Sequence, residues 1–228
     1  MLPLILTLGL IYTSTAFVVR PEASRSCQRL LRSSTTSTED AFRKVDAYLA
    51  SGGTEPRPML EAIEADFPSP ISEPNRSPQF LGEWHVHWTD CPPPSNGQLG
   101  PFLGTSGQFI RDDGLYQNLL CVPPNDWLTA VLDGKWEDWD GRLLSMEDGT
   151  PGEAPSKQQD WGADHWKVTF VDLQISLFGW KLFRKDFPPN TSRIWRTTYM
   201  DDETRIVRAG RTGKIEDEYL FYTKRTPK

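Results

Sequence analysis

The chain has 228 residues, of which 37% are hydrophobic and 25% charged, a balance typical of a globular protein rather than a disordered one. Its formal net charge of −6 argues against a non-specific nucleic-acid-binding protein, which needs a basic surface. The three cysteines lack metal-site spacing and cannot all pair, so no disulfide framework is expected, although one bond between Cys91 and Cys121 stays open. Nine tryptophans suit either a large core or a wall against a hydrophobic ligand.

The N-terminal residues are typical of targeting segments. The apolar run Leu2–Tyr12 is too short to span a bilayer and is followed by small residues, so we assign residues 1–16 to a signal peptide. Residues 17–44 begin with Phe17 and are rich in Ser, Thr and Arg, as in transit peptides. This order resembles the bipartite presequences of algae with secondary plastids. It predicts a plastid location, whereas secretion with a basic propeptide is the alternative.

A helical lead-in and a tether are predicted over residues 45–78. Apolar residues recur at helical spacing between Glu39 and Leu49, after a capping residue at Ser37. A second short helix is expected from Arg57 to Phe67. The proline-rich stretch that follows, up to Pro78, forbids regular structure and therefore serves as a tether.

Residues 79–228 read as a run of short strands. Asp113-Gly114 and Asp133-Gly134 are hairpin turn signals, and no long helical pattern interrupts the run. An antiparallel meander is therefore expected, with enough strands to close a barrel that holds a small ligand. Residues 92–104 and 147–162 are expected to be loops. The predicted strands are Gly82–Thr89, Gly107–Arg111, Leu115–Val122, Trp127–Leu132, Lys135–Trp139, Arg142–Met146, His165–Leu173, Gln174–Leu182, Arg193–Tyr199, Thr204–Arg208 and Tyr219–Thr223.

Two phrases at the ends of this domain resemble a known family. Residues 81–84 read LGEW, after a helix and a proline-containing linker, and residues 197–210 read TTYMDDETRIVRAG. Both resemble the plastid lipid-associated proteins, the plastoglobulins or fibrillins of chloroplasts. The resemblance implies a mainly β fold, an antiparallel lipocalin-like β-barrel preceded by a short helical N-terminal segment.

The same resemblance implies a non-catalytic role without a cofactor. Members of the family bind or organise carotenoids, quinones or other lipids at thylakoid membranes or plastoglobules. We therefore expect a hydrophobic small molecule as ligand, peripheral association with a membrane, and no nucleic-acid partner.

Six residues are candidates for ligand binding. Trp84, Val86 and Trp88 share one face of their strand and are expected to line the barrel. Arg205 is expected to stack on Trp84, as arginine does on tryptophan in lipocalins. The resemblance suggests Asp201 as a contact for polar ligand groups, although a turn role for this aspartate is favoured. The candidates are Trp84, Val86, Trp88, Tyr199, Asp201 and Arg205.

Other chemistry has less support in the sequence. His85 and His87 form a His-x-His pair, but an outward polar face explains them without a metal. Nucleophile, P-loop and dinucleotide motifs are absent, so no catalytic residue is predicted. Residues 180–185 mix aromatics with cations and face either anionic headgroups or water.

Two alternatives to the non-catalytic carrier stay open. A lipocalin-fold enzyme acting on an isoprenoid needs an acid that faces the barrel interior. An assembly factor for a photosynthetic or biosynthetic complex needs a filled barrel and an exposed aromatic patch.

Overall fold

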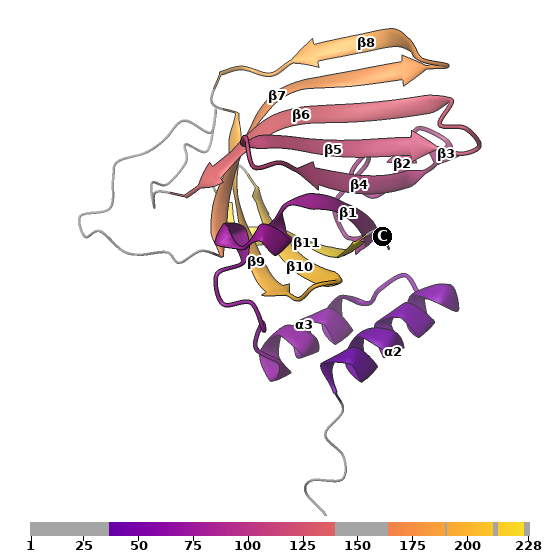
Figure 1. Cartoon of the computed structure of the whole chain (residues 1–228). Helices are drawn as coiled ribbons and strands as arrows, with labels where there is room; N and C mark the ends of the chain where they lie inside the picture. The colour runs from indigo at the N-terminus through magenta and orange to yellow at the C-terminus, as the bar shows by residue number, and fades with distance from the viewer. Residues whose placement is uncertain (1–36, 140–163, 190, 212–213, 226–228) are drawn as a thin grey trace, which may run out of the picture.

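The computed structural model describes residues 37–139, 164–189, 191–211 and 214–225, which form two helices and a strongly curved antiparallel sheet (Figure 1). The helices are α2 (Thr38–Ala50) and α3 (Arg57–Asp66), followed by the short 3-10 turns η1 (Pro74–Arg76) and η2 (Pro78–Phe80). The strands are β1 (Gly82–Thr89), β2 (Gln98–Leu99), β3 (Phe102–Leu103), β4 (Thr105–Ile110), β5 (Leu115–Val122), β6 (Leu128–Asp138), β7 (His165–Leu177), β8 (Trp180–Asp186), β9 (Ser192–Met200), β10 (Thr204–Arg211) and β11 (Lys214–Arg225).

Eight strands of the nine-stranded sheet form a closed ring. They pair in the order β6, β5, β4, β1, β11, β10, β9 and β7, and β7 pairs with β6 to complete the ring. Every pairing is antiparallel. The predicted mainly β, antiparallel class with a helical N-terminal segment is therefore confirmed.

Strand β7 has two different partners along its length. Residues His165–Thr169 pair with β9, whereas residues Asp172–Leu177 pair with β8. The ring is therefore continuous at the His165 end, and at the Leu177 end β8 extends the sheet beyond the ring. Figure 1 shows the β7–β8 hairpin at the edge of the molecule that is farthest from the two helices.

Aromatic side chains fill the continuous end of the ring. Trp84, Trp166 and Trp195 are buried there, and Phe80 closes the end from η2. The ring of Phe80 packs edge-on against Trp166, with centroids 5.0 Å apart. The indole Nε1 of Trp84 donates a hydrogen bond to the carbonyl of Phe80 at 3.0 Å, so the start of β1 is tied to its own lead-in.

The two helices cover the outside of β9, β10 and β11 (Figure 1). The predicted cap is observed, since the Ser37 hydroxyl accepts from the Asp40 amide at 3.1 Å. Phe42 is buried against the rings of Tyr199 and Tyr222, at centroid distances of 5.0 Å and 5.7 Å. The boundary predicted at residue 44 therefore divides helix α2, whereas the signal peptide at residues 1–16 and residues 17–36 lie outside the described residues.

The predicted strands are largely confirmed, and β1 and β5 have the predicted bounds. The hairpin predicted at Asp133-Gly134 is wrong, because β6 continues through it with an irregularity opposite β7. The break predicted between Leu173 and Gln174 is also wrong, since β7 continues to Leu177 and the turn at Phe178-Gly179 lies inside the predicted strand Gln174–Leu182. The predicted loop 92–104 contains the two short strands β2 and β3. Strand Arg142–Met146 and loop 147–162 lie outside the described residues.

Candidate functional site

Trp84 and Arg205 meet at the filled end of the ring. The indole of Trp84 lies between two guanidinium groups, with Arg205 at 4.6 Å and Arg225 at 4.3 Å from the ring centroid. The predicted stacking is therefore confirmed. The Arg205 guanidinium also donates hydrogen bonds to Gln108 Oε1 and to Thr223 Oγ1. Both Trp84 and Arg205 are fully buried, so they close the ring instead of lining a pocket.

Burial has a clear electrostatic effect at this end. Desolvation lowers the pKa of Arg205 from its ordinary 12.5 to about 9, and the charge of Arg225 adds to the effect. The remaining candidate on this side, Val86, packs against the same aromatic core.

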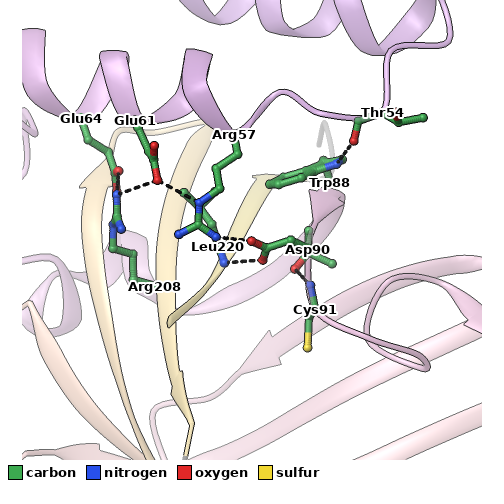
Figure 2. Close-up of polar contacts among 10 residues, drawn as sticks. Thr54, Arg57, Glu61, Glu64, Trp88, Asp90, Cys91, Arg208 and Leu220 are labelled. Atoms are coloured by element: carbon green, nitrogen blue, oxygen red, sulfur yellow. Dashed lines mark hydrogen bonds and ion pairs between the residues drawn. The ribbon is translucent and has the colours of Figure 1, made fainter. Parts of the chain in front are cut away.

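Trp88 does not share a face with Trp84 and Val86, so that part of the prediction is wrong. The pairing of β1 with β11 shifts between Val86 and Trp88, and this irregularity reverses the alternation of side chains. Trp88 packs beneath the helices and its Nε1 donates to the carbonyl of Thr54 at 3.0 Å (Figure 2).

Tyr199 and Asp201 lie outside the ring, on the side covered by α2. The Asp201 carboxylate accepts from the backbone amides of Glu203 at 2.9 Å and Thr204 at 2.6 Å. It also accepts from the Tyr199 hydroxyl at 2.8 Å. Asp201 therefore fixes the β9–β10 turn, and the six predicted residues do not form one site.

A small pocket lies inside the ring, between the filled end and the β7–β8 hairpin. Apart from Leu119, its lining residues on β4, β5, β6 and β7 share one face of the sheet, the face that also carries Trp84. One cross-strand row contributes Asn118, Leu132 and Leu173 to the lining, and the next contributes Ser106, Leu120 and Ala130. Pro94 and Ser95, from the segment after β1, also line the pocket, and Phe187 contributes from beyond β8.

The pocket has a volume of about 130 Å³ and is mainly apolar. Cavities of about 150 Å³ hold one benzene-sized group, whereas complete small-molecule sites begin at about 300 Å³. Asn118, Ser95 and Ser106 are the polar residues of the wall, and Asn118 Nδ2 donates to Ser95 Oγ at 3.4 Å. The Oδ1 of Asn118 is buried and has no hydrogen-bond partner among the described residues.

The sequence carried a weak signal for this pocket. Asn118 and Leu120 alternate with outward residues in β5, as Ala130 and Leu132 do in β6. Alternation identifies two faces, but only closure of the ring decides which face is inside. Among the described residues that line the pocket, none is acidic.

The contact between α3 and the ring is polar and internally paired. The carboxylate of Glu64 binds the Arg208 guanidinium, and Arg57 bridges Glu61 and Asp90 (Figure 2). A cleft of about 510 Å³ borders this contact. Because these opposite charges satisfy one another, we assign the cluster to helix docking.

Burial also raises the pKa of three tyrosine phenols above the ordinary value of 10.0. They are Tyr116, Tyr199 and Tyr222. The hydroxyl of Tyr116 has no hydrogen-bond partner within the described residues. Desolvation is the main cause in all three cases.

No family model, curated protein or solved structure matches this chain. Among the described residues, no group of three or more His, Cys, Asp or Glu side chains is placed to hold a metal ion. Neither described helix has the length and apolar character needed to cross a membrane. The Cys91–Cys121 bond left open by the sequence is not formed.

Proposed function

We propose that the protein is a non-catalytic, lipocalin-like barrel of the plastid lipid-associated type. It binds one end of a carotenoid, quinone or lipid in the ring pocket, and it associates peripherally with thylakoid membranes or plastoglobules. The observation that carries the proposal is the apolar pocket of about 130 Å³ between β4–β7 and the segment at Pro94 and Ser95.

The size of the pocket limits what it binds. A volume of about 130 Å³ accommodates one ring or one chain end, and the rest of a long isoprenoid or acyl chain lies outside. Burying such an end contributes roughly 25 cal/mol per Å² of apolar area before entropy costs.

The filled end of the ring supports the lipocalin-like assignment. The LGEW motif places Trp84 at the start of β1, where it stacks against Arg205 from the second motif, residues 197–210. The two segments that carry the family resemblance are therefore neighbours in space. A plastid location remains a proposal that rests on residues 1–44.

The ligand proposal is tested by filling the pocket. Ala130 lines it and lies next to Val131, whose side chain faces the other side of β6. A polyene fatty acid that fluoresces in apolar surroundings serves as the probe. We expect Ala130→Phe to weaken probe binding at least about tenfold, a loss of roughly 1.4 kcal/mol. The control Val131→Phe keeps the wild-type affinity.

Native ligand is then identified by organic extraction and mass spectrometry of the protein purified from its own cells. Near-ultraviolet circular dichroism verifies that both variants keep their tryptophan packing. Equal probe affinity in the two variants, or no binding by the folded wild type, contradicts the proposal.

A second candidate is an assembly factor for a larger complex. It is favoured by the exposed aromatic side chains of β8, among them Trp180. This candidate replaces the carrier if the purified protein contains no lipid and Ala130→Phe behaves as wild type.

A further inference from the structure

Three aromatic rings meet where the β2–β3, β5–β6 and β7–β8 connections end, and two exposed hydrophobic residues lie beside them in the sequence. The rings of Phe102 and Trp127 are 4.9 Å apart, and those of Trp127 and Phe178 are 5.9 Å apart. Phe178 is 73% exposed, Trp180 is 80% exposed and Leu103 is 74% exposed. We call Phe102, Leu103, Trp127, Phe178 and Trp180 the tip cluster. Exposed aromatic groups of this kind mark an interaction surface, because folding alone does not stabilise them in water.

Backbone conformation strengthens this reading at Phe178. The turn between β7 and β8 consists of Phe178 and Gly179, with φ values of +49° and +81°. Two-residue hairpin turns with positive φ favour Asn-Gly, and a bulky residue is rare in the left-handed region. The Phe178 side chain is therefore held in a strained backbone conformation although it is mostly exposed to water. This combination indicates that the residue has a role other than stabilising the fold.

Strand β8 adds positive charge beside the tip cluster. All seven of its residues are exposed, and residues 180–185 contain Lys181, Arg184 and Lys185 but no acid. Arg184 is engaged by Asp172 and Asp186, whereas the two lysines flank the exposed Leu182 and Phe183. The chain as a whole is acidic, with 31 acidic and 25 basic residues. Local cations interleaved with aromatics complement an anionic lipid surface.

We propose that the tip cluster and β8 form the face through which the protein lies on an anionic lipid bilayer. This inference rests on the membrane association proposed above, but not on the proposed ligand. The two helices lie at the opposite side of the molecule and remain in water (Figure 1). Across β5, β6 and β7, the row Val122, Leu128 and Leu177 separates the pocket from the tip.

The experiment measures partition of the full-length protein onto vesicles of phosphatidylcholine with roughly one third phosphatidylglycerol. The double variant Phe178→Asn with Trp180→Ser is expected to partition at least about tenfold more weakly. Lys181→Gln with Lys185→Gln is expected to lose roughly 25-fold, about fivefold for each cation. The matched control is Phe109→Ser, which removes an exposed phenylalanine from the outer face of β4 and leaves partition unchanged.

Tryptophan fluorescence distinguishes membrane contact through this face from membrane contact through the apolar N-terminal run. Brominated acyl chains quench tryptophans that enter the bilayer, and Trp180 is expected to provide most of the quenched emission. The quenching is therefore expected to fall by at least about half in Trp180→Phe, which keeps an aromatic ring.

Several results overturn the proposal. If the wild type binds vesicles and the tip and lysine variants bind equally well, membrane association stands but this face is wrong. The edge of β8, which pairs only with β7 among the described strands, then fits a strand of a partner protein better. If the wild type binds no vesicles, membrane association fails as well. Equal binding to neutral vesicles overturns the role of the cations.

Discussion

Helix α2 is expected to be an integral part of the fold, and Phe42→Ala tests this directly. The Phe42 side chain is 5% exposed and contacts the rings of both Tyr199 and Tyr222. Replacing a buried phenylalanine by alanine usually costs 3–5 kcal/mol, and each aromatic pair contributes about 0.5–1.5 kcal/mol within that sum. We expect a loss of about 3–4 kcal/mol, a large part of the usual 5–15 kcal/mol of a folded protein.

The loss is measured by urea unfolding followed by tryptophan fluorescence. The control Lys44→Ala changes an exposed residue of the same helix and is expected to stay within about 0.5 kcal/mol of the wild type. A loss below about 1 kcal/mol for Phe42→Ala contradicts the reasoning, because α2 would then be detached from the ring in solution. Removal of the residues up to 44 would in that case leave the fold intact, whereas the expected result means that the folded domain needs α2.

Three further outcomes follow from the structure. The three buried tyrosines keep their phenol protons in the folded state, whereas the same phenols ionise near pH 10 in the unfolded state. The free energy of unfolding is therefore unaffected by these groups below pH 10. Above pH 10 it falls by about 1.4 kcal/mol per pH unit for each tyrosine. When the free energy of unfolding is measured by urea titration at several pH values, Tyr116→Phe is expected to remove a third of this fall with pH and to keep the wild-type stability at neutral pH. An unchanged dependence on pH contradicts this expectation. Phe178→Asn relieves the left-handed φ of +49° and is expected to raise stability by about 1 kcal/mol in thermal unfolding, so a loss would refute the strain. Glu64→Gln is expected to cost about 1–3 kcal/mol, and a double-mutant cycle with Arg208→Gln that shows no coupling would place the helix contact elsewhere.

The two regions of the ring interior, the filled end and the pocket, are expected to respond differently to mutation. Substitution of Trp84 or Arg205 is expected to unfold the closed end, because both are fully buried and stacked. Loss of ligand in such variants would therefore say little about binding. Substitution of Ala130 changes the pocket wall and is the more informative choice.

Local sequence signals determined the helices and most strands. Capping at Ser37, the repeat of Phe42 and Val45 at helical spacing, and the Asp113-Gly114 turn each act within a few residues, so they can be read directly. The stacking of Trp84 on Arg205 was also predicted, but through a family resemblance and not through spacing.

Only the tertiary structure decided which side chains meet. The irregularity after Val86 turns Trp88 out of the ring, because it depends on the register of β1 against β11, its partner from the far end of the chain. The pocket at Asn118 and Ala130 depends on closure of β7 against β6, which alternation within a strand does not encode. Short-range chemistry thus determined the elements of this protein, whereas long-range pairing determined its interior.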